Sequence, residues 1–386
     1  MSKKLTIAMF GHKRVPSREG GVEIVVENLC TRMAAKGHRV SCYNRRGHHV
    51  SGAEFDTQQT GTHQGVRIRS VWTLDRKGLA AMTSSLSAAV CTAFSKADVV
   101  HIHAEGPAFM CWLPKLFRKR VVVTIHGLDW QRGKWKQGFA SKYIHAGEKM
   151  AVRFADQIIV LSRNIQDYFK TTYGRDTVWI PNGVSRPRQM DADRIRERFD
   201  LKKDGYILFL GRLVPEKGVH YLIEAFRKVE TNKKLVIAGG TSGTDDYIRS
   251  LKALAEGDSR IRFTGFVQGQ TLEELYSNAY VYVLPSDVEG MPLSLLEAMS
   301  YGNCCLVSSI PECTEVVEDK AAVFEKGNVD ALRRSLQTLC DDPSTVAGYK
   351  ESACDFICRK YDWDQITERT LELYDESFVD QQVSAS

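Results

Sequence analysis

The sequence predicts an α/β protein made of two doubly wound domains, each a parallel sheet with helices on both faces. Three observations predict this architecture. The chain has 386 residues, more than one typical hydrophobic core accommodates. Strand-like and helix-like segments alternate along nearly its whole length, a pattern that builds parallel sheets. Near residue 184 the alternation stops and restarts, and the sign of the charge changes.

The first half of the chain alternates strongly. It opens with a β-rich run at 5–11, a polar loop, and a helical run at 22–36 that ends at Gly37 as a C-cap. Further strands are predicted at 38–43, 66–71, 99–103, 121–125, 157–162 and 178–180. Helices are predicted at 79–94, near 109–117, at 141–154 and at 164–172.

The second half repeats the pattern after a linker. Residues 184–193 hold a proline and charges without apolar periodicity. Strands are predicted at 206–210, 234–238, 261–263, 280–284 and 304–308, and helices at 219–229, 247–255, 272–277, 329–340 and 347–361. We therefore expect domains at 1–184 and 185–361, and a region at 362–386 whose helix, 363–378, crosses back to the first domain before a disordered tail.

The two halves differ in charge. Residues 1–188 contain 30 Lys and Arg against 13 Asp and Glu, net +17, and residues 189–386 contain 23 against 34, net −11. A basic half of this size attracts phosphorylated ligands, nucleic acid or an anionic membrane surface. One cluster of four basic residues fits lipid headgroups and a solvated helix end equally well. It comprises Lys115, Arg118, Lys119 and Arg120.

Composition excludes several classes of protein. No apolar run approaches the roughly 20 residues that span a bilayer, and the first residues lack the apolar core of a signal peptide. We therefore expect a cytoplasmic protein. The ten cysteines show no C-x-x-C spacing, so we expect reduced, mostly buried thiols.

The most informative stretch is 284–302, LPSDVEGMPLSLLEAMSYG. It predicts the end of a buried strand, a polar turn, and a helix with Pro292 in its first turn. Backbone N–H groups at such a helix start form a ready anion site. Glu289 lies in the turn, and Glu297 lies in an apolar run where its carboxylate needs hydrogen-bond donors. Taken alone, a glutamate near a helix start is explained equally well by a favourable interaction with the helix dipole, without any ligand.

Ligands of open parallel sheets bind beyond the carboxyl ends of the strands, so we expect two such domains to face each other across a cleft. The loop 211–218 lies at such an end and carries Arg212 and Lys217, which can hold two adjacent phosphates. It is not a Walker loop, and a basic loop is more often solvated surface. Gly20 and Gly21 precede the first helix without a G-x-G-x-x-G pattern, which disfavours hydride transfer.

A second group of candidates follows the strand 121–125. His126 closes this strand, and Asp129, Trp130 and Arg132 lie in the polar, aromatic loop beyond it, of the kind that binds sugars. His103 ends the preceding strand and faces the same side as His101. Zinc would need a third close ligand that the sequence does not offer, so we expect chemistry without a metal.

These segments together resemble the family-4 retaining glycosyltransferases of GT-B fold, over nearly the whole chain. The most specific match is Glu289, seven residues, then Glu297. It is supported by the segments 211–218, 20–23, 126–127 and 180–183. The segment 126–135 and the helix 141–156 resemble a branch that includes rhamnosyltransferases of bacterial surface polysaccharides. Met291 and Pro292 stand where many members carry an aromatic residue and a glycine, which leaves the donor sugar open.

The resemblance implies roles for these residues. Arg212 and Lys217 would neutralise the diphosphate leaving group, and Glu297 would bind the ribose and Glu289 the transferred sugar. Other donor-side positions would be Gly20, Gly21, Gly211, Phe266, Val267, Gly290, Met291, Pro292 and Leu293, with Phe266 and Val267 at the base. His126 would contact the donor sugar. The acceptor side would comprise Asp129, Trp130, Arg132, Glu148 and His103. The reaction would retain configuration, without a metal or other cofactor.

The first hypothesis is therefore a hexosyltransferase that moves a sugar from a UDP-, GDP- or dTDP-linked donor to a hydroxyl of a growing surface polysaccharide or oligosaccharide. Its acceptor would be lipid-linked, at the cytoplasmic face of the membrane, which the basic half would contact. An epimerase on the same scaffold and a non-catalytic pseudo-transferase that binds a partner are the alternatives. Nucleic-acid binding would explain the basic half but not the loops of the second domain.

Overall fold

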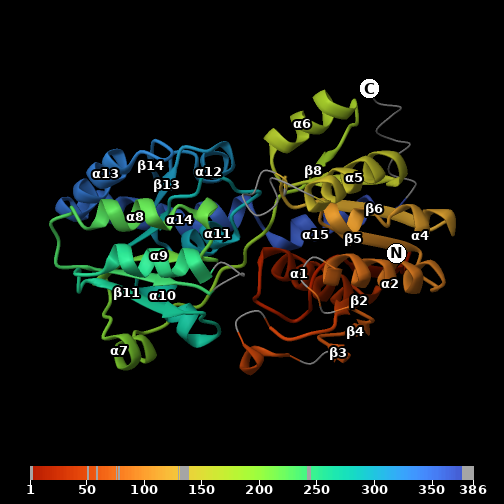
Figure 1. The fold of residues 1–386 in the computed structure, drawn as a ribbon, viewed down its shortest axis with the longest axis horizontal. Coiled ribbons are helices and arrows are strands. Elements are labelled where there is room, and N and C mark those ends of the chain that lie inside the picture. The colour runs from red at the N-terminus through yellow and green to blue at the C-terminus, as the bar shows by residue number, and fades with distance from the viewer. Residues whose placement is uncertain are drawn as a thin grey trace. The chain divides into compact units, whose positions relative to one another are not determined.

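The computed structural model describes residues 3–49, 52–57, 60–74, 76, 79–128, 130, 139–240 and 245–375, with the backbone alone at 139 and 140. The chain forms two compact units. Unit 1 comprises Met1–Asn182 and Trp363–Ser386, and unit 2 comprises Gly183–Asp362. Each unit is a sheet with helices packed on it (Figure 1), so the predicted α/β class is confirmed. That the units serve as acceptor and donor domains stays a prediction.

Unit 1 is built on an eight-stranded sheet within the described residues, in the order β3-β4-β2-β1-β5-β6-β7-β8. Its strands are β1 (Thr6–Phe10), β2 (Arg39–Arg45), β3 (Gly61–His63), β4 (Val66–Val71), β5 (Val99–His103), β6 (Arg120–Ile125), β7 (Gln157–Val160) and β8 (Val178–Trp179). Its helices are α1 (Gly21–Ala35), η1 (Ala53–Phe55), α2 (Leu79–Ala93), α3 (Glu105–Ala108), α4 (Trp112–Leu116), α5 (Phe139–Phe154), α6 (Arg163–Tyr173) and α15 (Trp363–Glu372). Its core contains buried side chains of β1, β5, β6 and β7 together with buried side chains of the helices α2, α5 and α6.

The C-terminal helix α15 belongs to unit 1 although its sequence follows unit 2. It lies beside α1 (Figure 1). Arg32 of α1 forms an ion pair with Asp364 at 3.0 Å and lies over the ring of Trp363. Beyond the helix, the Leu373 carbonyl oxygen accepts a hydrogen bond from Nε of Arg120 at 2.8 Å. The end of the described chain therefore packs against the first domain's sheet.

Strand β3 departs from the predicted parallel pattern. It pairs antiparallel with β4, so unit 1 has a mixed sheet. The connection is the two-residue turn Gln64-Gly65, in which both residues have positive φ, 45° and 82°. Such a turn matches the twist of a hairpin. With only three residues, β3 is too short to produce a periodic signal in the sequence.

Unit 2 is built on a six-stranded sheet within the described residues, in the order β11-β10-β9-β12-β13-β14, with every pair parallel. Its strands are β9 (Tyr206–Leu210), β10 (Lys234–Ala238), β11 (Ile261–Gly265), β12 (Val281–Leu284), β13 (Cys304–Ser308) and β14 (Ala322–Phe324). Its helices are α7 (Arg194–Phe199), η4 (Pro215–Lys217), α8 (Val219–Phe226), α9 (Asp245–Ala255), α10 (Gln270–Asn278), α11 (Leu293–Ser300), α12 (Pro311–Val317), α13 (Val329–Asp341) and α14 (Pro343–Lys360).

One further difference from the prediction concerns a short helix. The helix expected near 109–117 corresponds to α4 alone, and the separate four-residue helix α3 precedes it. Pro114 has no N–H to continue a helix from the preceding turn, so it lies in the first turn of a new helix. All ten cysteines, each in the described part of the chain, are free thiols, and six of them are buried. Among the helices of the described ranges, none has the length and apolar character that crossing a bilayer requires.

Candidate active site

In unit 2, glycines hold the loop that follows β9 against its neighbours. Gly218, which ends this loop, has a left-handed φ of 64°, and a Cβ there would lie 2.0 Å from the Pro285 carbonyl oxygen. Only glycine therefore lets the loop reach the chain that leaves β12. A Cβ on Gly239 would lie 1.8 Å from the carbonyl oxygen of Gly211. Close backbone contacts thus hold both ends of the loop.

This contact brings Lys217 and Glu289 together. Nζ of Lys217 lies 2.5 Å from Oε1 of Glu289, and their side chains are only 14% and 7% exposed. The hydroxyl of Ser286 donates to the same carboxylate oxygen at 2.7 Å. The family resemblance implies that Lys217 binds a diphosphate and Glu289 a sugar, whereas in the structure the two pair with each other. Each charge therefore compensates the other in a nearly buried position.

Helix α11 begins one residue later than predicted. Pro292 is its N-cap, with ψ of 97°, and Leu293 is the first helical residue, so Pro292 lies just outside the helix instead of in its first turn. The amides of Leu295 and Leu296 donate to the Pro292 carbonyl oxygen at 3.0 and 3.2 Å. The amides of Leu293 and Ser294 come before these two, at the positions that find no acceptor within a helix, so the helix start can still receive an anion. The residues at this start are all buried: Gly290, Met291, Pro292 and Leu293.

A tyrosine supports the carboxylate of Glu297. Its half-buried side chain lies one turn into α11. The hydroxyl of Tyr276 lies 3.2 Å from Oε2 of Glu297 and 3.3 Å from the Ser294 carbonyl oxygen. Tyr276 is itself buried and stacks on Tyr301, with ring centroids 5.3 Å apart. The donor that this carboxylate requires thus comes from α10, a helix distant in sequence.

The other predicted donor-side residues lie on loops along the same edge of the sheet. Arg212 is half-buried in the loop after β9, and Phe266 and Val267 are half-buried in the loop after β11. The amide of Gly239 donates to the Gly265 carbonyl oxygen at 2.9 Å. This bond joins the start of the β11 loop to the end of β10. Because β11, β10, β9 and β12 are parallel neighbours in that order, their loops share one edge.

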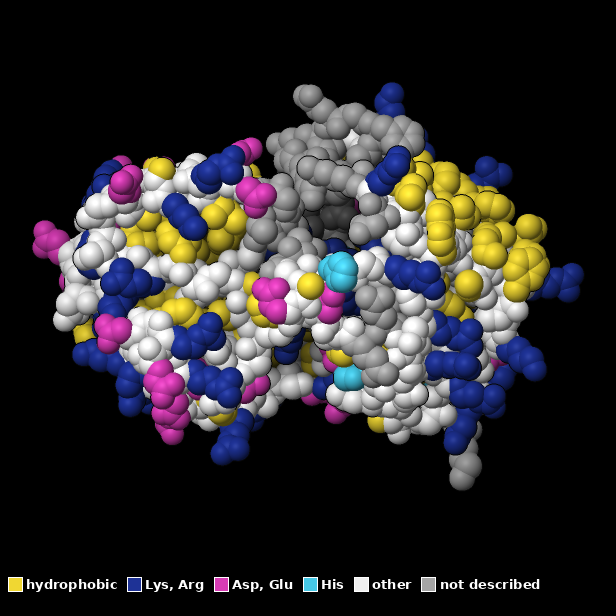
Figure 2. Space-filling view, turned by 60° about the horizontal axis from the view of Figure 1, so that its bottom comes forward, with side chains coloured by type: hydrophobic (Ala, Val, Ile, Leu, Met, Phe, Trp, Pro, Cys, Tyr) yellow, Lys and Arg dark blue, Asp and Glu magenta, His cyan; other side chains and the backbone are white. Residues whose placement is uncertain are grey.

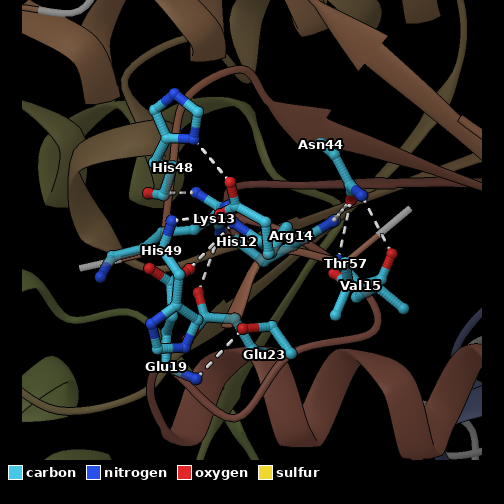
Figure 3. Close-up of polar contacts among 12 residues, drawn as sticks. His12, Lys13, Arg14, Val15, Glu19, Glu23, Asn44, His48, His49 and Thr57 are labelled. Atoms are coloured by element: carbon cyan, nitrogen blue, oxygen red, sulfur yellow. Dashed lines mark hydrogen bonds and ion pairs between the residues drawn. The ribbon is translucent and has the colours of Figure 1, made fainter. Parts of the chain in front are cut away.

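In unit 1, a buried ion-pair network holds the loop that follows β1 (Figure 3). Nε of Arg14 lies 3.0 Å from Oε2 of Glu19, and both side chains are buried. The same guanidinium lies 3.2 Å from Asp56 and donates to the carbonyl oxygen of His48 at 2.7 Å. The loop is thereby tied to a segment more than thirty residues later. No local pattern in the sequence indicates this network.

Asn44, near the end of β2, holds the same loop from the other side (Figure 3). Its side chain accepts a hydrogen bond from the Val15 amide at 3.0 Å and donates to the Val15 carbonyl oxygen at 2.9 Å. Its Oδ1 also lies 3.0 Å from Nε2 of His12. Burial lowers the pKa of His12 to about 4, so this imidazole is neutral at pH 7.

The loop leads into Gly20 and Gly21, at the start of α1. Gly20 is the extended N-cap and Gly21 the first helical residue. Glu23 in the first turn accepts a hydrogen bond from the Lys13 amide at 2.9 Å. A Cβ on Gly20 would lie 2.8 Å from the Glu23 carboxylate, so glycine leaves room for this bond. Burial raises the pKa of Glu23, but the charge and the amide of Lys13 outweigh it, and the net shift is downward.

Three histidines lie together on β5 and at the end of β6. Nδ1 of His103 lies 3.1 Å from Nε2 of His126, and the rings of His101 and His103 are 4.2 Å apart. His101 is also hydrogen-bonded to the hydroxyls of Thr124 at 2.7 Å and Tyr374 at 2.6 Å. Burial holds the pKa of His103 well below its usual range and lowers that of His101 to about 3. His103 is therefore a buried, neutral partner of His126.

Glu148 and Trp130 meet through Tyr168. Glu148 is fully buried in α5, and its Oε2 accepts hydrogen bonds from the hydroxyls of Tyr168 at 3.0 Å and Tyr173 at 2.7 Å. The ring of Trp130 lies near those of Tyr168 and His145, with centroids 6.0 and 5.2 Å apart. Burial and the Glu148 carboxylate raise the pKa of Tyr168 to about 12. The other two predicted acceptor-side residues lie outside the described residues: Asp129 and Arg132.

The structure thus groups most predicted residues on two edges, one in each unit. Sequence reasoning missed the residues that support them, namely Arg14, Glu19, Asn44, Tyr168 and Tyr276. Among these residues, only Asn44 could have been found from the sequence, because it is a polar residue near the end of a predicted strand. In the described part of the chain, no three His, Cys, Asp or Glu side chains are grouped as metal ligands would be.

Two family models match consecutive parts of the chain. The model described as Glycosyltransferase Family 4 matches residues 19–188, and the model described as Glycosyl transferases group 1 matches residues 191–373. The boundary between them falls at the linker, and together they span almost the whole chain.

Several relatives align over the chain. An uncharacterised glycosyltransferase of Methanocaldococcus jannaschii is 27% identical over 96% of this chain and 98% of its own length. Glycogen synthase of Mycobacterium tuberculosis is 28% identical over 96% of this chain and 94% of its own. An O-antigen chain mannosyltransferase B of Escherichia coli is 30% identical over 47% of this chain and 48% of its own. The two relatives whose activity is named are a glycogen synthase and a mannosyltransferase, so the rhamnosyltransferase branch is not confirmed.

Solved structures share the fold. Sucrose-phosphate synthase from Thermosynechococcus elongatus superposes with a TM-score of 0.79 at 20% identity, covering 99% of this chain and 100% of its own. Anabaena HepE in complex with UDP and glucose superposes with a TM-score of 0.79 at 17% identity, covering 95% of this chain and 98% of its own. At these identities the likeness concerns the fold alone.

Proposed function

The chain belongs to the GT-B glycosyltransferases of group 1 and family 4, and from that premise we propose that it is a retaining, metal-independent hexosyltransferase. Its donor is a sugar linked to UDP, GDP or dTDP. Its acceptor is a hydroxyl of a growing, lipid-linked surface polysaccharide or oligosaccharide at the cytoplasmic face of the membrane. Both family models describe glycosyltransferases, which favours transfer over the epimerase and the non-catalytic binding protein.

The single observation that carries the donor site is the nearly buried contact of Lys217 with Glu289 beside the start of α11. When a nucleotide sugar binds, its diphosphate competes with Glu289 for the ammonium of Lys217. Arg212, on the same loop, adds a planar fork of donors for phosphate oxygens. The carboxylate of Glu289, released from the lysine, then accepts hydrogen bonds from hydroxyls of the transferred sugar. This exchange stabilises the charge that develops on the leaving group.

The nucleoside occupies the neighbouring loops of unit 2. Glu297, oriented by the hydroxyl of Tyr276, accepts hydrogen bonds from the ribose hydroxyls. The backbone of Phe266 and Val267 holds the base, and Gly211 and the helix start at Gly290, Met291, Pro292 and Leu293 surround the diphosphate. As the glycosidic bond breaks, an oxocarbenium-like centre forms. The leaving phosphate takes the acceptor's proton, so no side chain need act as nucleophile.

Unit 1 supplies the acceptor side. Trp130 and Glu148, joined through Tyr168, bind the acceptor glycan together with Asp129 and Arg132. His126, whose ring is oriented by His103, contacts the donor sugar. Gly20 and Gly21 let the backbone at the start of α1 approach the phosphates. The aromatic face suits the apolar face of a sugar ring, and the carboxylate suits its hydroxyls.

The first experiment is a screen of activated sugars for slow donor hydrolysis, because it identifies the donor without knowledge of the acceptor. We expect release of one nucleoside diphosphate from one class of donor. Arg212→Ala with Lys217→Ala should abolish this release, whereas Lys228→Ala, at an exposed position of unit 2, should leave it unchanged. Full turnover by the double variant would refute the diphosphate assignment. NMR of the anomeric proton in the product then tests retention.

A further inference from the structure

Helix α2 and the residue after it contain no charged side chain. The segment runs from Leu79 to Phe94, LAAMTSSLSAAVCTAF. A helix on the surface of a soluble domain normally turns charged residues to solvent. Here the outward positions are Leu86, Val90 and Phe94, spaced four apart on one face and exposed by 45%, 41% and 72%. The outer face of α2 is therefore apolar.

The end of α4 extends this apolar face. Leu116 is 70% exposed and Phe117 39% exposed. The rings of Phe94 and Phe117 are in edge contact, with centroids 4.6 Å apart, so the two helices share one surface. We call this set, Leu86, Val90, Phe94, Leu116 and Phe117, the apolar patch. Figure 2 shows hydrophobic side chains gathered on the surface of unit 1, with Lys and Arg beside them. An exposed group of this kind marks an interaction site.

Basic residues surround the apolar patch. Lys96 and Arg118 are exposed, and Nζ of Lys119 donates to the Ser95 carbonyl oxygen at 2.7 Å, immediately beside Phe94. Exposed Arg67 and Arg69 of β4 line a hollow together with Cys91, the residue after Val90 on α2. Two carboxylates near these residues are engaged. Asp156 pairs with Lys115 at 2.5 Å, and Asp98 accepts a hydrogen bond from the Thr6 amide at 2.7 Å.

We infer that the apolar patch and its basic rim dock unit 1 onto a lipid bilayer that contains anionic headgroups. Apolar side chains enter the boundary between headgroups and acyl chains, and the surrounding cations contact the headgroups. A second copy of the chain is a poorer occupant, because a symmetric contact would press two basic rims together. Only the biological purpose of this docking rests on the proposed function, since docking would hold the enzyme where a lipid-linked acceptor lies.

The test is flotation of the full chain with vesicles of phosphatidylcholine alone or with about one-third phosphatidylglycerol. We expect binding to the anionic vesicles that falls at least tenfold between 0.05 and 0.5 M salt, since surface charges are screened. Phe94→Glu with Leu116→Glu should reduce the partition coefficient at least tenfold. Lys96→Glu with Arg118→Glu should reduce the partition coefficient on anionic vesicles by roughly fivefold for each of the two cations lost.

Matched controls lie in unit 2. Val323→Glu replaces another exposed apolar side chain, 42% exposed, and Lys203→Glu with Arg334→Glu reverses two exposed charges; all should bind as the wild type does. Equal binding of wild type to both vesicle types, or unchanged binding of the Phe94→Glu, Leu116→Glu variant, would overturn the inference. The inference would also be overturned if the wild type bound no vesicles but self-associated in analytical ultracentrifugation, and the Phe94→Glu, Leu116→Glu variant did not self-associate.

Donor binding separates this inference from the proposed function. The patch variants should bind the nucleotide sugar by calorimetry as the wild type does, which also shows that they are folded. Vesicle binding without any transfer to a lipid-linked acceptor would refute the proposed acceptor and leave the docking surface standing.

Discussion

The contact between Lys217 and Glu289 allows the sharpest prediction. In Lys217→Met a similar length of side chain remains, but Glu289 keeps its charge at a position only 7% exposed. Removal of one partner costs about 3–5 kcal/mol for fully buried pairs and about 0.2–1 kcal/mol for exposed ones. This pair is nearly but not fully buried, and Ser286 still donates to the carboxylate. We therefore expect a loss of roughly 2–3 kcal/mol in the free energy of unfolding.

The assay is urea unfolding of the full chain, with thermal unfolding as a second measurement. For a unit of this size the loss corresponds to a fall in Tm of roughly 5–10 °C. The control is Lys234→Met. The ion-pair partner of Lys234, Asp200, is 96% exposed, so loss of this pair should lower the free energy of unfolding by at most about 1 kcal/mol. If Lys217→Met destabilised no more than Lys234→Met, the idea of a buried, mutually compensating pair would be wrong.

The same pair tests the proposed exchange. A double-mutant cycle of Lys217→Met with Glu289→Gln measures the coupling between the two side chains, which we expect to exceed about 1 kcal/mol. At saturating nucleoside diphosphate the coupling should fall, because the diphosphate takes the place of Glu289 at the ammonium. A coupling that the ligand leaves unchanged would contradict the exchange.

Three further predictions concern other parts of the chain. Gly218→Ala should lose at least about 1–3 kcal/mol of stability, because of its positive φ and the backbone that its Cβ would meet, whereas Gly348→Ala, in open space within α14, should gain up to about 1 kcal/mol; urea unfolding measures both. Tyr276→Phe removes the hydroxyl near Glu297 and should weaken nucleotide-sugar binding in calorimetry by about 0.5–1.5 kcal/mol; full affinity would contradict the role given to Glu297. Because the pKa of His101 is about 3 in the folded chain and about 6.5 unfolded, the unfolded state binds more protons below pH 6.5. Stability should therefore fall by about 2 kcal/mol from pH 7.5 to pH 5 on account of this group, and less steeply in His101→Gln; equal slopes in urea unfolding would refute this.

Much of the fold could be predicted from local pattern. The strands β4, β5, β9, β10 and β13 have the bounds that apolar runs predict, since each is a continuous apolar or alternating segment. Elements without such a signal were missed. β3 depends on its hairpin partner β4, and α3 is a helix of only four residues, too short for a periodic signal.

The candidate site could be predicted in part, because ligand loops follow the carboxyl ends of parallel strands. This rule selects the loops that carry Lys217, Glu289 and His126. It does not say what each side chain touches. The buried network of Arg14 and Glu19 and the neutral state of His103 both follow from burial, which is a property of the packed chain.

The sequence by itself determined the α/β class, the break near residue 184 and the loops at the strand ends, because periodicity, glycine placement and charge are local properties. Tertiary structure alone decided that Lys217 pairs with Glu289. These residues are 72 positions apart, and they meet because β9 and β12 are neighbours in the sheet and Gly218 allows close backbone contact. Strand order reflects the energy of the whole fold, so no single segment encodes it.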